Sequence, residues 1–257
     1  GKGSIELLVE AAKGISSKKN FFLNIVFEDK DLIIVNKQAG ILTHKSEKNK
    51  SFSLVDLLMQ NNITLNEEGD SFRQGVVHRL DKDTSGLIIF AKNYYASSQL
   101  KQQFANRTIK KVYEAIVWGK AQPITGTINL SIVNYLNKKK ISLGKNGKQA
   151  LTEYKVIKSY LNFFSLVECR IHTGRTHQIR VHMRSIGCPL VGDTLYAKDR
   201  NISKELPLKK AQAIFLFKRQ ALHAKELSFF HPVKKKQLTF KIQAPSDMKN
   251  LERTLFD

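Results

Sequence analysis

The sequence predicts an α+β fold, in which a mixed and mostly antiparallel sheet is flanked by helices and loops. Segments with strand-like patterning outnumber segments with helical periodicity, and the two kinds do not alternate strictly as in a parallel α/β protein. Hydrophobic residues make up 42% of the 257 residues, which suffices for a sizeable core and disfavours disorder. No internal repeat or low-complexity tract is visible. We therefore expect one folded domain over residues 21–257, preceded by a polar tail or linker stub over residues 1–20.

The first elements are two short strands and a helix. The segment FLNIVFEDKDLIIVNKQAG carries two apolar runs around an acidic turn at residues 28–31, which predicts a pair of strands. Ser53 is of a residue type that caps helices. The apolar residues Leu54, Leu57 and Leu58 follow it at helical spacing, so a short helix is expected there.

The middle of the chain predicts strand, polar loop, strand, helix and strand. GVVHRLDKDTSGLIIFAK has a polar centre between two apolar runs, and Leu87–Ala91 is the strand with the most buried character in the chain. Ala96, Leu100 and Phe104 are spaced by four residues, as on one face of an amphipathic helix. KVYEAIVWG then has the composition of a further strand.

The second half predicts strands with one short helix. Residues 134–149 are basic and contain Asn146-Gly147, which favours a hairpin or loop with its turn there. LTEYKVIKSY and FFSLVECRI alternate with period two around a short turn, which predicts an antiparallel pair. Ile179, Met183 and Ile186 have helical spacing, so a short helix should follow. LHAKELSFFHPVKKKQLTF predicts two closing strands around a proline-containing turn.

Charge and composition narrow the class of function. Lys and Arg number 43 and Asp and Glu 22, so the net charge is +21, and a pI near 9.9 favours a polyanion as partner. An acidic membrane surface is the second choice, but no basic amphipathic helix stands out and no apolar run approaches the roughly 18 residues of a membrane span. The first residues lack a signal-peptide core, and Cys169 and Cys188 allow one disulfide at most, so we expect a cytoplasmic protein.

The polar loop at residues 78–86 carries the best candidate for chemistry. It lies between two apolar strands, and a rigid frame often holds binding or catalytic groups on such a loop. Asp81 has Arg79 and Lys82 as sequence neighbours, and positive charge nearby favours the ionised carboxylate that a nucleophile needs. Two other interpretations are open. Asp81 could be a structural turn residue, or it could pair with Asp83 as in a glycosidase, although an extended loop would point the two carboxylates to opposite sides.

Several motifs, in order along the chain, resemble the RluA-type pseudouridine synthases. HRLDKDTSGLIIFAK resembles the signature of that family, DKDLIIVNKQAG its opening strand and turn, KKVYEAIVWG its tyrosine segment, HTGRTHQIRVHMRSIGCPLVGD its arginine segment and RQALHAKELSFFHPV its closing strand. The resemblance runs from about Phe21 to Pro245. Gln38 departs from it, since the family usually has proline there, and this loosens the turn. Residues 1–20 do not resemble the small RNA-binding domain that often precedes the catalytic domain in relatives, so we expect that domain either to be absent from the protein or to lie outside this sequence.

The resemblance implies the pseudouridine synthase fold with a central active-site cleft, and an isomerase. Such enzymes break the N-glycosidic bond of a uridine in RNA, rotate the base and rejoin it through carbon, which requires no cofactor. The sequence agrees in having no glycine-rich phosphate loop and no convincing metal cluster. By the resemblance, Asp81 is the essential carboxylate, Arg180 its partner and Tyr113 the tyrosine on which the flipped base stacks. Arg175 and Arg184 are alternatives for the partner of Asp81. The alternative role of Tyr113 is that of a core aromatic residue, and the alternative role of Arg180 is that of a surface arginine that binds phosphate.

Further residues match positions that contact the substrate in the family. Ile171 matches an aliphatic residue against the base, and Arg79 matches an arginine that fills the gap left by a flipped base, with a phosphate contact as its alternative. Arg175 and His177 stand beside these positions and are expected to hydrogen-bond or to touch phosphate. The three histidines that recur every five residues from His172 onward suggest a zinc site, but their spacing crosses a turn and then rotates about 140° around a helix, which disfavours one.

The remaining positive charge favours RNA as the partner. Lys138, Lys139 and Lys140 are candidate phosphate contacts, although a lysine run alone is usually a solvated face. The motifs PLVGD and RQALHA resemble the RluD branch, which implies uridines of 23S large-subunit ribosomal RNA, with transfer RNA as the alternative substrate. A non-catalytic RNA-binding ribosome-assembly factor is the alternative of another class, and the intact carboxylate, tyrosine and arginine named above disfavour it. We expect a cytoplasmic monomer without a metal or other cofactor.

Overall fold

The computed structural model describes residues 21–67, 71–136, 138–142 and 146–257, so the tail predicted over residues 1–20 lies outside the described part. The strands of the described part are β1 (Ile25–Glu28), β2 (Leu32–Lys37), β3 (Ser85–Ala91), β4 (Lys110–Trp118), β5 (Thr125–Asn129), β6 (Ser131–Tyr135), β7 (Lys138–Ser142), β8 (Leu151–Tyr160), β9 (Phe164–Ile171), β10 (Leu222–Phe230) and β11 (Gln237–Lys241). The helices are α2 (Leu54–Gln60), α3 (Tyr94–Ala105), α4 (Gln178–Ser185), α5 (Leu208–Leu216) and α6 (Ser246–Phe256), with a 3-10 turn at Ser71–Arg73.

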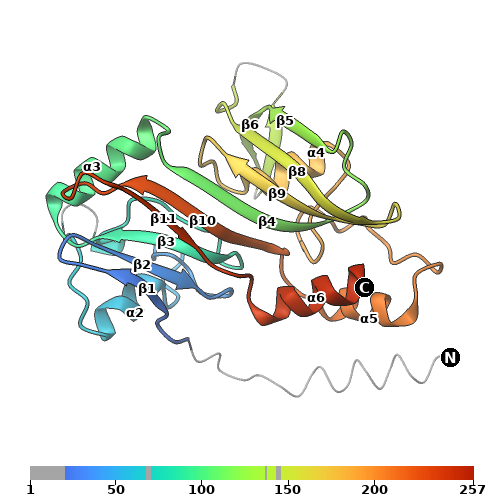
Figure 1. The fold of residues 1–257 in the computed structure, drawn as a ribbon, viewed down its shortest axis with the longest axis horizontal. Helices are drawn as coiled ribbons and strands as arrows, with labels where there is room; N and C mark the ends of the chain where they lie inside the picture. Colours follow the sequence, from blue (N-terminus) through green and yellow to red (C-terminus); the bar gives the residue numbers. More distant parts are fainter. Residues whose placement is uncertain (1–20, 68–70, 137, 143–145) are drawn as a thin grey trace.

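One long sheet organises the molecule (Figure 1). Its strands lie in the order β1-β2-β3-β10-β4-β9-β8-β5, and β11 pairs with β10. Among the described strands every pairing in this sheet is antiparallel except that of β3 with β10. The predicted mixed and mostly antiparallel sheet with flanking helices is therefore confirmed. The one parallel pairing joins the two halves of the sheet, and the polar loop at residues 78–84 enters β3 at this junction.

Glycine is required where β3 meets β10. Gly86 pairs with Ala224, and its φ of +121° lies in the region that favours glycine. A Cβ atom on Gly86 would lie 2.3 Å from the carbonyl oxygen of Ala224, which real atoms do not approach. The close approach brings the loop before β3 against β10 and β4, which carry other parts of the site described below.

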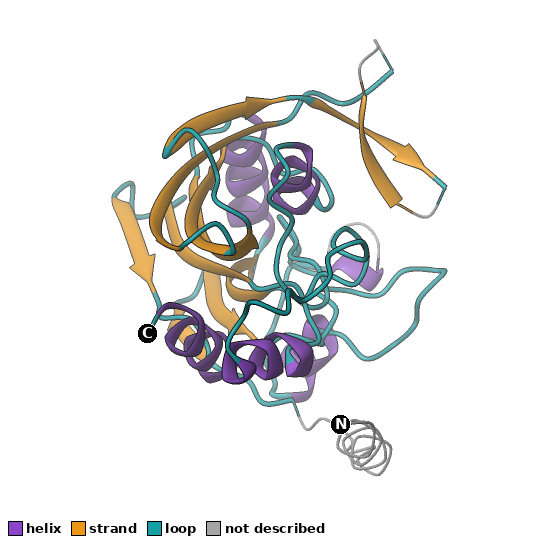
Figure 2. Ribbon diagram, turned by 90° about the vertical axis from the view of Figure 1, so that its right-hand side faces the viewer, coloured by secondary structure: helices purple, strands orange, loops and turns teal. Residues whose placement is uncertain are grey.

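The two faces of the sheet bury different clusters. Alternate residues of β2 point to opposite faces, with Ile33 and Val35 on one and Leu32 and Ile34 on the other. The first face packs against α2 and α4, and the opposite face against α3 at one end and α5 and α6 at the other. Figure 2 shows the curved sheet with loops gathered beside it and the β6–β7 hairpin projecting away from it.

Most of the predicted elements are confirmed. Ser53 caps α2 in a reciprocal capping box with Asp56, and all seven residues of β3 are buried. Three elements had no prediction: β5, and the two C-terminal helices α5 and α6. The basic hairpin predicted within residues 134–149 is confirmed as β6–β7. Asn146 and Gly147 do lie in a turn and bend, but this is not the turn between those strands, because Tyr135 pairs with Lys138.

Two expectations about the whole chain are also answered. Cys169 and Cys188 are both buried and both free, so the single conceivable disulfide does not form. In the described residues, none of the helices has the combination of length and apolar character needed to cross a bilayer.

Candidate active site

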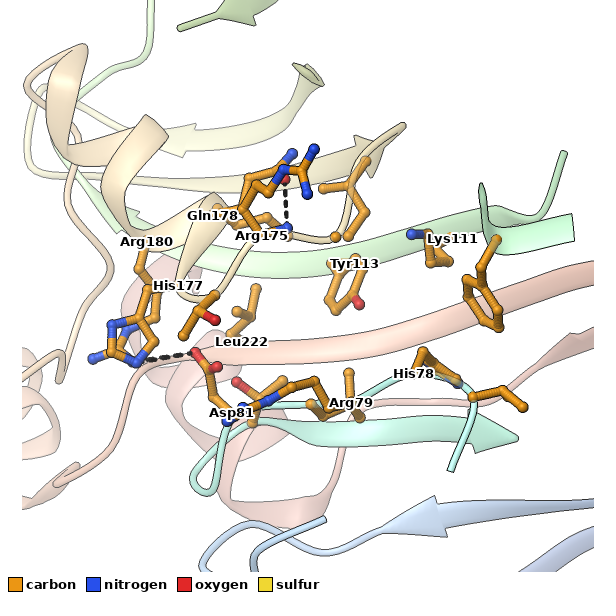
Figure 3. A pocket seen from close by; sticks show the side chains of 18 of the residues that line it. His78, Arg79, Asp81, Lys111, Tyr113, Arg175, His177, Gln178, Arg180 and Leu222 are labelled. Atoms are coloured by element: carbon orange, nitrogen blue, oxygen red, sulfur yellow. Dashed lines mark hydrogen bonds and ion pairs between the residues drawn. The ribbon is translucent and has the colours of Figure 1, made fainter. Parts of the chain in front are cut away.

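A cavity of about 350 Å³ opens on the face of the sheet that carries α4 (Figure 3). It is built from the loop before β3, from β4, from the end of β9 and from the start of α4. Seven of the predicted site residues line it: Arg79, Asp81, Tyr113, Ile171, Arg175, His177 and Arg180. Asp81 and Arg180, which lie 99 residues apart in sequence, thus meet at one place.

The loop that carries Asp81 is tied to the protein on both sides of that residue. Thr43 donates from its hydroxyl to the carbonyl of Leu80 and accepts from the amide of Leu80, at 3.0 and 3.2 Å. On the other side, Lys37 donates from its ammonium group to the carbonyl of Lys82 at 2.8 Å. These hydrogen bonds fix the backbone on either side of Asp81 and so limit the positions that its carboxylate can take.

Lys37 is an unusual anchor, because its side chain is almost fully buried. Its Nζ donates three hydrogen bonds, to the carbonyls of Gln38, Ile41 and Lys82. Burial lowers the pKa of Lys37 to about 7, against the opposing charge of nearby carboxylates. Gln38, the departure from the family pattern, accepts a hydrogen bond from the amide of Phe22 through its side chain. The turn after β2 is thus fixed by hydrogen bonds.

The alternative roles for Asp81 find no support in this geometry. Its side chain accepts from Arg180, and no hydrogen bond within the described residues joins it to its own turn, as a structural turn residue would make. Asp83 does not line the cavity, so the paired carboxylates of a glycosidase do not converge. Arg79 and Lys82 form no ion pair with Asp81 in the described structure, so their effect on its ionisation stays a prediction. The guanidinium group that contacts the carboxylate comes from helix α4.

Arg180 joins two carboxylates. Its Nη1 donates to Asp81 at 3.2 Å, while Nε and Nη2 donate to the two oxygens of Asp193 at 2.7 and 3.0 Å. The side chain of Asp193 is fully buried. Burial opposes the charge of Arg180, but its hydrogen bonds and the negative charge of both carboxylates raise the pKa of Arg180. Asp193 therefore fixes one edge of the guanidinium plane and leaves the remaining nitrogen to face Asp81.

The other two arginines of this segment are engaged elsewhere. Arg184 makes a bidentate contact with the exposed Asp199, and Arg175 donates from Nε to the carbonyl of Gln149. Arg180 is thus the arginine that pairs with Asp81, as the resemblance implied. Asp193 was not singled out from the sequence, although the PLVGD motif that contains it was noted.

Tyr113 points its ring into the middle of the cavity (Figure 3). The residue is 6% exposed and packs within the main cluster of the sheet, so the plainer role of a core tyrosine describes part of its environment. Burial raises the pKa of Tyr113 well above its ordinary value, and the charge of Asp81 adds to this effect. The phenol therefore stays protonated at neutral pH and presents a flat apolar surface with one hydroxyl.

His177 links the cavity to the projecting hairpin. Its Nδ1 lies 2.8 Å from the hydroxyl of Tyr196, which also accepts from the amide of Lys139 at 2.9 Å. Because that hydroxyl already accepts one hydrogen bond, its own proton is best directed at Nδ1, which leaves Nε2 with the proton that faces Asp81 at 3.9 Å. Burial lowers the pKa of His177, so the ring is neutral. The backbone of His177 has a φ of +58°, a strained conformation that occurs more often at functional sites.

Gln178 organises the turn that leads into α4. Its side-chain oxygen accepts from the hydroxyl of Thr173 at 2.6 Å and from the amide of Arg175 at 3.0 Å. Its side-chain nitrogen donates to the carbonyl of Leu151 and the hydroxyl of Thr152 on β8. Sequence reasoning missed this residue, because a glutamine at a helix start carries no distinctive pattern.

The predicted substrate-binding residues fall into two groups. Arg79 and Ile171 both line the cavity. The side chain of Arg79 is exposed at its rim, whereas Ile171 is buried. Lys138, Lys139 and Lys140 do not line this cavity but a separate hollow beside Tyr196. Their assignment as RNA contacts remains a prediction, at a distance from the site of chemistry.

Within the described residues, one cluster has the spacing of metal ligands: Asp29, Asp31 and His231. Hydrogen bonds within the protein already use the ring nitrogens of His231 and one carboxylate oxygen of Asp29. Nδ1 of His231 accepts from two backbone amides, so the ring proton lies on Nε2, which donates to Asp29 at 2.9 Å. Lys234 binds the same carboxylate oxygen at 2.7 Å. The three evenly spaced histidines form no such cluster in the described structure, and both ring nitrogens of His182 are bonded to β-strand and loop atoms.

The sequence is similar to a family and to named relatives. A family model described as RNA pseudouridylate synthase matches residues 31–185. The ribosomal large subunit pseudouridine synthase D of Buchnera aphidicola (subspecies Acyrthosiphon pisum) is 41% identical over 234 residues, covering 91% of this chain and 73% of that protein. The protein of the same name from Zymomonas mobilis is 41% identical over 237 residues with the same coverage. An RNA pseudouridine synthase of Aquifex aeolicus, called uncharacterized, is 38% identical over 236 residues, again with 91% and 73% coverage.

Solved structures show the same fold. Human RNA pseudouridylate synthase domain containing 4 superposes with a TM-score of 0.70 at 24% identity, covering 97% of this chain and 95% of that one. Human RNA pseudouridylate synthase domain containing 1 gives a TM-score of 0.68 at 25% identity, with 93% and 89% coverage.

Proposed function

We propose a function for this chain from one established premise: it belongs to the RNA pseudouridylate synthase family, and it is an isomerase of that family. The reaction moves the attachment of uracil on ribose from nitrogen N1 to carbon C5. The N1–C1′ bond breaks, a C5–C1′ bond forms, the proton on C5 leaves and N1 gains a proton, so that the product is an isomer of the substrate. No oxidant, reductant or group donor is consumed.

The contact between Arg180 and Asp81, in a cavity that Tyr113 lines, carries the proposed mechanism. We assign Asp81 the role of catalytic carboxylate, because Arg180 pairs with its charge and orients one of its oxygens. Tyr113 offers the flat surface on which uracil stacks. A uridine must leave its helical stack to reach this cavity, so the mechanism includes base flipping, with Arg79 at the rim in position to fill the gap.

The substrate that we propose is ribosomal RNA of the large subunit. Two relatives that are 41% identical carry that substrate in their names. The net charge of +21 suits a polyanionic partner of this size. Transfer RNA is the alternative, since the name of the Aquifex relative gives no target. Two free buried cysteines agree with a reducing compartment, so we place the reaction in the cytoplasm.

Release of tritium from RNA labelled at uracil C5 tests the catalytic assignment. Wild type should release label, and Asp81→Asn should lower the rate by about 10³-fold or more, because the amide cannot act as a charged base or nucleophile. Asp83→Asn is the matched control, since it removes a carboxylate from the same loop but outside the cavity. Equal rates for wild type and Asp81→Asn would remove Asp81 from the mechanism, and absence of release by wild type would favour the assembly-factor alternative.

Mapping pseudouridines by carbodiimide treatment and primer extension tests the substrate. RNA from cells that lack the gene should lose specific stops in large-subunit ribosomal RNA, and the gene should restore them. Stops lost only from transfer RNA would overturn the ribosomal assignment while leaving the chemistry intact.

A further inference from the structure

Lys111 is a cation of the cavity without an acidic partner. It lies on β4, two residues before Tyr113, and it is 9% exposed. Its Nζ lies 5.5 Å from the centre of the Phe104 ring and 3.7 Å from where a Cβ atom on Gly174 would be. In the described part of the chain, no ion pair or hydrogen bond engages this ammonium group, whereas Arg180 at the other end of the cavity contacts two carboxylates.

Burying a charge without a counter-ion costs free energy, so the presence of the Lys111 ammonium group in the cavity needs an explanation. Burial lowers the pKa of Lys111 to about 8, and no neighbouring carboxylate opposes this shift. The adjacent His78 is neutral, since burial lowers the pKa of His78 to about 3 and its Nε2 accepts a hydrogen bond from the amide of Ile89. It therefore does not act as a counter-ion for Lys111. A cation held ready in this way would gain most from a ligand that brings negative charge.

The position of Lys111 indicates which part of a substrate it meets. Residues two apart on a strand point to the same face, about 7 Å from one another. In Figure 3, Lys111 and His78 lie at one end of the cavity, Asp81 and Arg180 at the other, and Tyr113 between them. A nucleoside whose ribose faces Asp81 and whose base stacks on Tyr113 therefore directs the far edge of the base toward Lys111.

We propose that the ammonium group of Lys111 stabilises the negative charge that uracil carries once its bond to ribose has broken. This inference rests on the proposed function. When the N1–C1′ bond breaks, its electron pair stays with the base, and the charge spreads over N1 and the carbonyl oxygens. That charge exists whichever first step Asp81 performs. It is neutralised when the C5–C1′ bond forms; the C5 proton then leaves and N1 takes up a proton. Lys111 therefore acts most strongly on the detached base, which makes it a catalytic residue.

Single-turnover rates of wild type and Lys111→Met on two RNA substrates test the proposal. One RNA carries uridine at the target position and the other 5-fluorouridine, whose base forms a more stable anion because fluorine withdraws electrons. Conversion of both is followed as loss of the N-linked nucleoside from nuclease digests. Lys111→Met should slow the uridine reaction by about 10²-fold and the fluorinated one clearly less. Lys111→Arg should restore part of the uridine rate.

The controls separate this proposal from the function on which it rests. Lys110→Met removes an exposed charge from the neighbouring position, where Lys110 pairs with Glu226, and should leave both rates unchanged. Melting curves identify a variant that does not fold, in which case Lys111→Gln takes its place. Equal slowing of both substrates, or a rise in KM alone, would make Lys111 a phosphate contact and overturn the inference. Failure of wild type to convert either RNA would instead overturn the proposed function.

Discussion

The guanidinium group of Arg180 has two partners that require different explanations. The contact with Asp81 is single and lies at the cavity, whereas the contact with Asp193 is bidentate and fully buried. Asp193 also accepts from the amides of Leu195 and Tyr196, so the backbone after α4 holds this carboxylate in turn. The position of the arginine that pairs with Asp81 is therefore set by a residue that does not line the cavity.

Asp193→Asn should lower activity without removing any group that contacts RNA. The amide donates where the carboxylate accepted, so Arg180 loses its fixed plane and its alignment with Asp81. We expect kcat for tritium release to fall about 10-fold or more with KM little changed, and the free energy of unfolding to fall by about 2 kcal/mol or more. Asp199→Asn breaks the exposed bidentate pair with Arg184 on the same helix and should leave the melting temperature and kcat nearly unchanged. A folded Asp193→Asn protein with wild-type kcat would contradict this role.

The pH dependence of the rate should report Lys111. Its folded-state pKa is about 8, so the ammonium form predominates below that value and is lost above it. The neighbouring His78 is neutral and Tyr113 is protonated over this range, and Arg175 of the adjoining turn also lines the cavity. We expect kcat/KM of wild type to fall as pH rises through about 8 and this fall to move to higher pH in Lys111→Arg, whereas any change near pH 7 from the anchoring Lys37 should be the same in both proteins. An unchanged profile in that variant would assign the titration to another group.

At the scale of elements, sequence patterning predicted what depends on local chemistry. The capping box at Ser53 and the buried strand β3 followed from residue type and spacing. No helix was predicted at α5 and α6, although apolar residues at helical spacing, such as Met248, Leu251 and Leu255, indicate α6. Asn146 and Gly147 lie in a turn as predicted, but local patterning could not show which strands the hairpin joins: β6 pairs with β7, and Ile132 bridges to Lys148.

The junction of β3 and β10 should tolerate no side chain at its glycine. Gly86→Ala places a Cβ atom 2.3 Å from the backbone oxygen of Ala224, so the two strands must separate. We expect a loss of about 3 kcal/mol or more in the free energy of unfolding, and a loss of activity, because the Asp81 loop enters through this strand. Gly187→Ala is the matched control: its φ is +78°, but nothing lies within 4 Å of the added atom, so only backbone strain of about 1–2 kcal/mol is expected. Chemical denaturation of both variants gives the comparison, and equal losses would show that backbone strain alone explains Gly86.

At the scale of the whole molecule, the site is an assembly of segments that only the fold brings together. Motif resemblance could name Asp81, Tyr113 and Arg180, because each stands in a distinctive run of residues. It could not find Asp193 or Gln178, whose importance lies in contacts with Arg180 and with the turn before α4. Nor could it separate the lysines of the β6–β7 hairpin from the cavity, since charge alone does not give distance.

The salt dependence of RNA binding should locate the surface that the net charge of +21 creates. Each lysine–phosphate contact adds about 0.7–0.9 to the slope of log affinity against log salt, because binding releases counter-ions. Replacing Lys138, Lys139 and Lys140 by glutamine should therefore reduce that slope by about 2 if all three touch phosphate, and the hairpin should stay folded, since Lys139 contacts Tyr196 through its backbone amide. The control replaces three exposed lysines of the opposite face of the sheet, at and around α5: Lys204, Lys209 and Lys218. Both variants lower the net charge by the same amount. A general electrostatic attraction would therefore reduce the salt slope of both variants alike. A docking surface on the hairpin requires the slope to fall in the hairpin variant alone.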